Sequence, residues 1–492
     1  MMPPYAPEVQ EARSRGAGAS RRLPARVDAV TLLTVYLVLL VGVPATLVVG
    51  ALGAAGSPAT LYGAACLAWW TFGRIDRRFG LAKGRQPLYF VVGAFVVAML
   101  CGYAAGAIRV ALPLEVRSAD RAMLKMLSGI GVLLLAADGL RRREDIDRLL
   151  RRVAVAGGVL AGVGLLQFLF AIEVTSYIRI PGLVSQMSTN IIQQRSMFRR
   201  VSGTTSHPIE FGVTLCILFP IALHCALTAV ARSRRYWTIA ILIGAAIPTS
   251  ISRSAMLGLG LSWGVLIVGW EPRRRLNALL VTPLALAVMR LAVPGLLGTI
   301  KSLFTGLSND PSYLGRTKDY EYVGRFIAES PWFGRGFGTF VPELYTTLDN
   351  QYLAQIVETG YVGLTALLVL LTSGLVLGWK IKRRAADSSQ RSLGVALTAA
   401  AIVPLATFIT FDGLSFNVVT GFTFLILGCT GAGYRLYVDG GRTPPDAGRT
   451  PAGHGDQPRV GKGSPPFPPP ATPAPGEMAP AGGAVFRAEE RR

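Results

Sequence analysis

The chain has 492 residues, and its 50 Lys and Arg outnumber its 28 Asp and Glu, which gives a formal net charge of +22. Hydrophobic residues make up 51% and charged residues only 16%, below the roughly 25% usual for soluble domains. From about residue 28 to residue 437, apolar runs alternate with short basic clusters. The typical length of these runs matches a hydrocarbon core about 30 Å thick. This pattern excludes a soluble globular fold and a disordered chain, and because the runs are continuous it also excludes a membrane β-barrel.

The apolar runs predict an all-α polytopic membrane protein with about twelve transmembrane helices. The expected spans are residues 28–52, 57–73, 87–106, 121–139, 152–172, 208–230, 236–250, 254–270, 276–296, 358–379, 393–411 and 415–437. Two of these runs, 57–73 and 236–250, are short, so ten or eleven spans are also compatible with the sequence. The first run is too long for a cleaved signal peptide and predicts an uncleaved anchor.

Lys and Arg in the short loops predict the orientation of the spans. Basic clusters precede the first span and follow the second, fourth, sixth, eighth and tenth, whereas the first and eleventh loops contain no Lys or Arg. We therefore expect both termini in the cytoplasm. The expected parts are a basic cytoplasmic segment 1–27, a transmembrane domain 28–437 and a Pro-, Gly- and Ala-rich cytoplasmic tail 438–492. That tail cannot bury a core and is predicted to be disordered.

Two long loops, residues 173–207 and 297–357, fall on the predicted outer side, the second between spans nine and ten. Long loops usually carry function or are disordered, and the aromatics and glycines in these two favour function. The first loop ends in Arg199 and Arg200, followed by His207 and Pro208. Pro208 predicts the first turn of a helix, and a helix N-terminus favours anions. His207 is the only histidine in an outer loop; the alternative is that it is simply packed and hydrogen-bonded.

Arg253 lies between two apolar runs on the predicted outer side. An Arg at mid-membrane costs about 2.5–3.5 kcal/mol on insertion scales, so such residues are functional candidates. One interpretation is an interfacial side chain that extends to water. The other is an anion clamp, because the planar guanidinium can bind two phosphate oxygens at once.

The 297–357 loop contains the largest number of candidate residues. Residues 316–330 predict an amphipathic helix that Pro331 ends, with Arg316 and Arg325 available to an outer cavity. Further along, Asp349 has two interpretations that are compatible with each other. It caps a short helix that Gly360 closes, or it accepts a proton from an attacking sugar hydroxyl.

Other patterns predict packing or solvent exposure rather than chemistry. Asp145 and Asp147 resemble a metal-binding pair but lie among six arginines, where a solvated charged face is the simpler interpretation. The five cysteines have no zinc-site spacing, and we expect no metal and no cofactor. The basic residues lie where a membrane protein needs them, so nucleic acid is not an expected partner. Small residues spaced four apart, Gly102 with Gly106 and Gly158 with Gly162, predict close helix packing.

Four stretches together resemble the O-antigen ligase and O-antigen polymerase superfamily of bacterial envelope enzymes. They are Arg200-Val-Ser-Gly-Thr-Thr-Ser-His207-Pro208, Ser250-Ile-Ser-Arg253-Ser-Ala, Arg316 with Glu329-Ser-Pro331-Trp-Phe-Gly334-Arg-Gly336-Phe-Gly338, and Asp349-Asn350-Gln-Tyr352-Leu353 with Glu358-Thr-Gly360-Tyr-Val-Gly363. The likeness covers roughly residues 195–375. The first five spans match only in being apolar.

The resemblance implies a metal-independent, inverting glycosyltransferase in the bacterial inner membrane. Its donor would be a glycan on an undecaprenyl diphosphate carrier, and its acceptor a glycan or lipid-linked glycan. By matching motif, Arg200, Arg253 and Arg316 would bind the diphosphate, to which we add Arg325. The candidate catalytic residues are Asp349, Arg316 and His207.

One departure bears on the reaction. Ligases of this family typically have His-Asn where this chain has Asp349-Asn350, which favours a polymerase or a broader polysaccharide ligase.

Two other functions fit parts of the sequence. Twelve spans with both ends inside are also typical of a transporter or a flippase of lipid-linked glycan, although here the bulk of the loops lies outside between spans nine and ten. A non-catalytic envelope assembly partner is the third possibility, with the Pro-rich tail recruiting cytoplasmic proteins.

Overall fold

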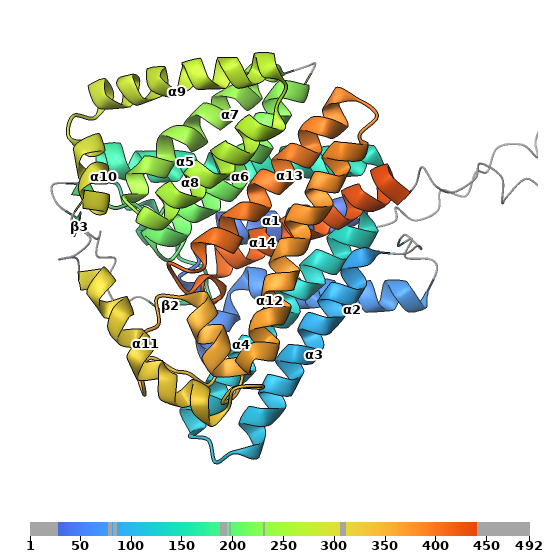
Figure 1. Cartoon of the computed structure of the whole chain (residues 1–492), viewed down its shortest axis with the longest axis vertical. Coiled ribbons are helices and arrows are strands. Elements are labelled where there is room, and N and C mark those ends of the chain that lie inside the picture. Colours follow the sequence, from blue (N-terminus) through green and yellow to red (C-terminus); the bar gives the residue numbers. More distant parts are fainter. Residues whose placement is uncertain are drawn as a thin grey trace, which may run out of the picture. The chain divides into compact units, whose positions relative to one another are not determined.

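The computed structural model describes residues 28–76, 81, 86–186, 194–195, 198–229, 232–305 and 311–439. The predictions for residues 1–27 and 440–492 lie outside these residues. Side chains are not described at 302–305 and 311–319, which include Arg316. The described chain is almost entirely helical (Figure 1), so the all-α fold class is confirmed.

Each of the twelve predicted spans overlaps one of twelve helices of the described chain. These are α1 (Ala29–Gly42), α2 (Pro58–Ile75), α3 (Pro87–Ile108), α4 (Pro113–Gly139), α5 (Arg143–Phe170), α6 (Pro208–Thr228), α7 (Ser233–Ala246), α8 (Arg253–Gly269), α9 (Pro272–Ala292), α12 (Gln351–Arg384), α13 (Ser388–Thr407) and α14 (Asn417–Tyr434). Among the described residues, seven of these helices are long and apolar enough to cross a membrane, and α1 and α8 are shorter apolar helices. The number twelve itself stays a prediction.

The long loop after α9 holds two further helices, α10 (Leu296–Thr305) and α11 (Pro311–Glu329). The helix α11 matches the amphipathic helix predicted for residues 316–330. Short antiparallel pairs join β1 (Leu47–Val48) to β2 (Val184–Ser185) and β3 (Gln194–Arg195) to β4 (Phe198–Arg199). Two 3-10 turns, η4 (Ile247–Ser250) and η6 (Gly413–Ser415), precede α8 and α14.

The first span differs from its prediction of residues 28–52. Helix α1 ends at Gly42, and the chain turns into β1 and the 3-10 segment η1 (Gly50–Gly56). Pro44 explains the early end, because a proline disfavours helical backbone at the residue before it, and Val43 is extended with φ −97° and ψ 123°. With 14 residues, α1 is about 21 Å long at about 1.5 Å per residue.

The connecting loops form two sets, as the alternation of basic clusters predicts. At one end of the bundle, the amide of Ala45 donates to the carbonyl of Thr204 at 2.8 Å, and Asn417 donates to the carbonyl of Ala54 at 3.0 Å. At the other end, Arg435 donates to the carbonyl of Leu140 at 2.7 Å. These bonds agree with the predicted division for the loops that they join, while the full division and the side of the membrane that each set faces stay predictions.

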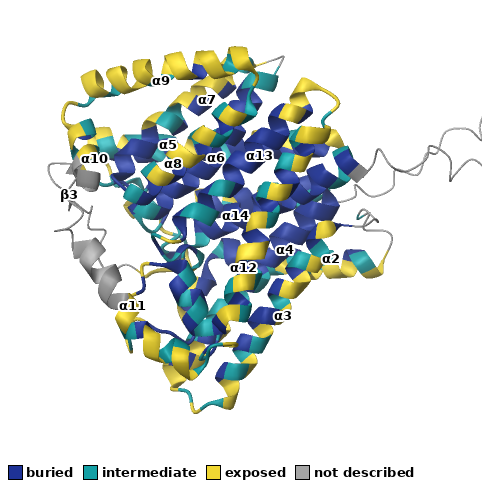
Figure 2. Ribbon diagram, viewed as in Figure 1, coloured by how far each residue is buried: buried dark blue, intermediate teal, exposed yellow. Residues whose placement is uncertain are grey.

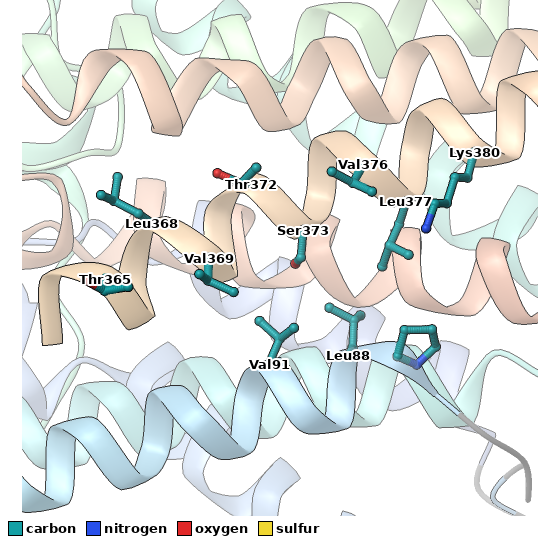
Figure 3. A pocket seen from close by; sticks show the side chains of 11 residues that line it. Leu88, Val91, Thr365, Leu368, Val369, Thr372, Ser373, Val376, Leu377 and Lys380 are labelled. Carbon is teal, nitrogen blue, oxygen red and sulfur yellow. The ribbon is translucent and has the colours of Figure 1, made fainter. Parts of the chain in front are cut away.

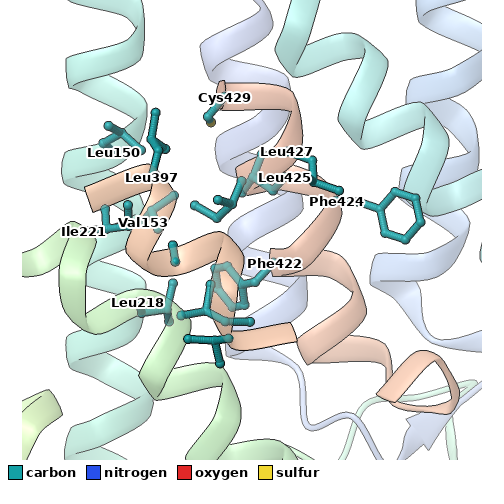
Figure 4. Packing of buried hydrophobic residues seen from close by; sticks show 14 of the residues in the cluster. Leu150, Val153, Leu218, Ile221, Leu397, Phe422, Phe424, Leu425, Leu427 and Cys429 are labelled. Atoms are coloured by element: carbon teal, nitrogen blue, oxygen red, sulfur yellow. The ribbon is translucent and has the colours of Figure 1, made fainter. Parts of the chain in front are cut away.

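The core lies around α14 and α6. Of the most apolar 18-residue window of each helix, 89% is buried in α14 and 83% in α6, against 6% in α9, and Figure 2 shows α9 as an exposed helix at the periphery. Leu218 and Ile221 of α6 lie near Phe422 and Leu425 of α14 and near Leu397 of α13 (Figure 4). A helix that is apolar all round is buried among other helices or in lipid, and this bundle contains both kinds.

The small-residue patterns differ in what they pack against. A Cβ atom at Gly102 would lie 2.8 Å from the side chain of Thr359, and one at Gly106 would lie 2.9 Å from the backbone of Gly336. Gly102 therefore packs against another helix, as predicted, whereas Gly106 packs against a loop. Gly158 lies against Ile239, but a Cβ at Gly162 would meet nothing within 4 Å. The prediction that Gly162 packs closely is therefore wrong, because spacing along a helix does not say whether a neighbour occupies that face.

We expect Gly102→Val to weaken the packing of α3 on α12, because the added side chain would overlap Thr359. Overpacking of this kind typically costs about 1–3 kcal/mol. Thermal unfolding of the purified protein in detergent should show a lower midpoint. Gly93→Val is the matched control on the same helix, since a Cβ there would meet nothing within 4 Å. Equal midpoints for the two variants would contradict the prediction.

Candidate active site

The segment from Arg200 to His207 is held against α5 and α6 by its glycine. Gly203 has φ +59°, and a Cβ there would lie 3.0 Å from Leu160 and from Phe211. The side chain of Gln167 clamps the same residue, accepting from its amide at 2.8 Å and donating to its carbonyl at 3.1 Å. The left-handed backbone and the crowded space both require glycine here.

His207 and Pro208 start α6 in the way that the sequence predicts. Pro208 is the first helical residue, and the Nδ1 atom of His207 accepts from the amide of Ile209 at 3.2 Å. Burial and, to a smaller extent, the positive charge of Arg200 together lower the pKa of His207 to about 4. At neutral pH the imidazole is therefore an uncharged helix cap next to a guanidinium.

Arg200 meets the motif that carries Arg253. The Nε atom of Arg200 donates to the carbonyl of Ser250 at 3.2 Å, and Arg253 is the half-buried first residue of α8. Between Ser250 and Arg253 in the chain, the buried Ile251 has φ 45° and ψ 50°. Left-handed backbone is a genuine outlier for a β-branched residue, and such strain persists only where the surroundings impose it. The structure thus brings Arg200, His207 and the segment of Arg253 together.

Glu210 connects the N-terminus of α6 to that of α14. Its side chain is fully buried, and its Oε2 atom accepts from the amide and the hydroxyl of Ser206, both at 2.8 Å. Its Oε1 atom accepts from the amide of Val418 at 2.7 Å. One carboxylate therefore satisfies unbonded amides at two helix starts, where negative charge is favoured.

The start of α12 lies against the same region. The amide of Gln351 donates to the carbonyl of Phe408 at 2.8 Å, and its side-chain oxygen accepts from the amide of Leu414 at 2.7 Å. The hydroxyl of Thr410 donates to that of Ser254 in α8 at 2.7 Å. Helices α6, α8, α12 and α14 thus begin at one connected site, and the positive ends of their dipoles favour an anion there.

Asp349 lies at this site, but it is not the helix cap. The cap of α12 is Asn350, whose oxygen accepts from the amides of Tyr352 and Leu353 at 3.0 and 3.2 Å. That interpretation of Asp349 is therefore wrong, because the neighbouring amide fills the capping position. Asp349 is exposed, so its carboxylate is left available to a substrate.

A second carboxylate, Asp412, accompanies Asp349. Burial raises the pKa of Asp412, a hydrogen bond from Ser415 and the charge of Lys125 lower it, and the charge of Asp349 raises it. Lys125 reaches this loop from α4, and its ammonium donates to the carbonyl of Ser415. The sequence analysis did not single out Asp412, Lys125 or Glu210. Lys125 and Glu210 carry a usable signal, because each is an ionisable residue inside a predicted apolar run.

The third and fourth motifs meet at a break in α12. Gly360 has φ 65° and ψ −167°, which interrupts the helix. The freed carbonyls of Val357 and Glu358 accept from the amides of Arg335 and Gly336 at 2.9 and 3.0 Å, and the amide of Tyr361 donates to the carbonyl of Pro331 at 2.8 Å. Gly360 thus ends the first part of α12, as predicted.

Arg335 anchors the same loop to α4. Its guanidinium donates to Glu115 at 2.9 Å and stacks 4.3 Å from the ring centre of Tyr345. Arg109 also donates to Glu115, at 2.8 Å. Glu115 is 1% exposed, so this cluster is an internal tie that fixes the loop.

The two remaining predicted arginines lie on α11. Arg325 is exposed and stacks on its own helix, 4.7 Å from the ring centres of Tyr322 and of Phe326. The side chain of Arg316 lies outside the described residues. The Tyr320 hydroxyl accepts from the side chain of Asn350 at 3.3 Å, which connects α11 to the start of α12.

The fold and the site define a multi-pass membrane protein with arginines, carboxylates and helix N-termini gathered at one end of its bundle. Residues 238–368 match the family model described as O-antigen ligase. This segment contains Arg253, Asp349 and the break at Gly360. This match covers less than half of the chain and supports its resemblance to the O-antigen ligase and polymerase superfamily. No curated protein matches the chain.

We expect the protein to lose stability as the pH falls and His207 gains a proton. Its folded-state pKa of about 4 lies below the ordinary value of 6.5, so as the pH falls the unfolded chain binds the proton first. The stabilising contribution is complete above about pH 6.5 and is lost between about pH 6.5 and 4. Thermal unfolding at pH 7.5 and pH 5 should show a larger drop for the unmodified protein than for His207→Asn, which keeps a good helix cap. The same drop in both would contradict the prediction.

Proposed function

We propose that this protein transfers a glycan from an undecaprenyl diphosphate carrier to a sugar hydroxyl, on the outer side of the cytoplasmic membrane. The observation that carries the proposal is the bond between Arg200 and the Ser250 carbonyl, three residues before Arg253, at a site where four helices begin. A diphosphate is the kind of group that such a site favours, because it carries negative charge and oxygens for bidentate guanidinium contacts.

The leaving group determines what the arginines do. As the bond from the anomeric carbon to the phosphate oxygen breaks, the electron pair stays on the diphosphate. Arg200 and Arg253 then stabilise charge that is greater in the transition state than in the bound donor. Arg316 and Arg325 on α11 are proposed to complete this set over the donor. The strained backbone at Ile251 fixes the carbonyl of Ser250, and therefore the direction of Arg200.

Asp349 is the proposed base. The acceptor hydroxyl forms the new bond at the anomeric carbon from the face opposite the diphosphate, which inverts the configuration, and its proton passes to the carboxylate. Asp349 is exposed at the start of α12, next to Asp412. His207 is an uncharged cap beside Arg200, so we assign it the role of positioning the segment. No step of this scheme uses a metal ion.

We expect Arg253→Ala to lower the rate of transfer about 10²–10³-fold, as the loss of one transition-state donor does in other enzymes. Arg253→Lys should be impaired as well, because lysine keeps the charge but not the bidentate geometry. The measurement is transfer from a defined undecaprenyl-diphosphate oligosaccharide in vesicles. Arg179→Ala, an exposed arginine of the loop that carries Arg200, is the control. Full activity in Arg253→Ala would refute the proposed role.

We expect Asp349→Asn to slow transfer about 10²–10⁴-fold, the usual contribution of a general base, while binding of the donor is unchanged. Asp349→Glu should restore part of the rate. The exposed Glu343 of the same loop provides the control Glu343→Gln. Loss of donor binding together with activity would assign Asp349 a structural role instead. In the same assay, a longer glycan on the carrier identifies a polymerase, and a glycan on a new anchor identifies a ligase.

A further inference from the structure

A groove of about 420 Å³ lies between α3 and α12 (Figure 3). Ligand pockets commonly measure about 300–1,000 Å³, so its size is that of a binding site. Residues from only these two helices line it. Both are apolar enough to cross a membrane, so the groove faces the hydrocarbon region of the bilayer.

The walls of the groove are apolar, with one charged side chain. Val369 and Val376 are 48% and 45% exposed, so they are open to the surroundings rather than packed. The hydroxyl of Ser373 donates to the carbonyl of Leu370 at 2.6 Å, so its hydrogen is already used. Lys380 is exposed and is the only ionisable residue of the lining.

The lysine lies where an α-helix reaches the edge of the membrane. It precedes the basic last turn of α12, which contains Lys382, Arg383 and Arg384, and Leu88, near the start of α3, lies toward the same end of the groove (Figure 3). An apolar channel that ends at a cationic membrane boundary is complementary to a hydrocarbon chain with a phosphate at its head. Basic residues near the membrane surface attract anionic lipids in this way.

We propose that the groove between α3 and α12 binds an acyl chain of an anionic phospholipid, whose phosphate contacts Lys380. In the predicted orientation, this lipid belongs to the cytoplasmic leaflet.

The lipid of this groove is a different molecule from the glycan donor. Lys380 lies 20 residues after Gly360, where α12 is interrupted, which is about 30 Å along the unbroken second part of the helix at about 1.5 Å per residue. Arg200 and Arg253 lie at the other end of the bundle, with the start of α12. One lipid cannot hold its phosphate at both ends, so the phospholipid and the donor occupy separate sites.

The first experiment titrates the full-length protein in detergent with dioleoyl phosphatidylglycerol, and separately with dioleoyl phosphatidylcholine, and counts bound lipid by native mass spectrometry. We expect phosphatidylglycerol to bind more tightly. Lys380→Gln should weaken its binding about fivefold, because one lysine near an anionic lipid surface contributes about 1 kcal/mol. The control is Arg273→Gln, an exposed arginine at the start of α9 that does not line the groove. Equal binding of both lipids that is insensitive to Lys380→Gln overturns the proposal.

The second experiment fills the groove. Val369→Trp should remove binding of phosphatidylglycerol, whereas Val97→Trp, at a 59% exposed position of α3 outside the groove, should leave it unchanged. Equal binding to both tryptophan variants would place the lipid elsewhere and overturn the proposal. Displacement of phosphatidylglycerol by an equal concentration of undecaprenyl phosphate would assign the groove to the carrier and would also overturn it. The Lys380→Gln comparison tests the proposal even where a tryptophan variant does not fold.

Discussion

The break in α12 at Gly360 leaves backbone groups without partners inside the helix. These groups constrain the loop that precedes α12. A membrane-spanning helix has no water to bond a broken turn, so the protein must supply the partners itself. Here the segment from Pro331 to Gly336 supplies them. The same segment lies against α3, where Gly106 admits the backbone of Gly336 at a distance that no side chain would allow. The break in α12 and the glycines of the loop therefore require one another, and backbone hydrogen bonds fix the segment from Pro331 to Gly336.

A second constraint acts at the starts of the helices. Glu210 connects α6 to α14, and Gln351 connects α12 to the loop between α13 and α14. Because these bonds satisfy amides that would otherwise be buried without partners, the helix starts hold fixed positions. Arginines placed on such a frame need little reorganisation when charge develops, which is the condition under which electrostatic stabilisation is effective.

The sequence was sufficient to predict much of this arrangement. Each predicted apolar run overlaps a helix of the described chain, and Pro208 located the start of α6. The alternation of basic clusters separated the loops into two sets. Each of these signals is local, or depends only on the length of a helix relative to a bilayer.

What the sequence could not predict depends on neighbours. Asp349 and Asn350 are both good caps, and only the geometry of the turn selects Asn350. Gly162 has the right spacing but no helix against it. Lys125 approaches Ser415 from a helix that is nearly 300 residues earlier in the chain, and no short-range pattern reports such a pair. The proposed roles of Arg200, Arg253 and Asp349 rest on the proximity of their segments in the folded chain and on the resemblance to the O-antigen ligase family.

The outer loop has a small core of its own. Val323, Phe340, Leu348, Leu353 and Val357 form a buried cluster separate from the main one, and it joins α11 to the first part of α12. Side chains in this cluster can change without unpacking the helices that cross the membrane. A change in this small core therefore alters the surface over the helix starts while the main core of the bundle keeps its packing.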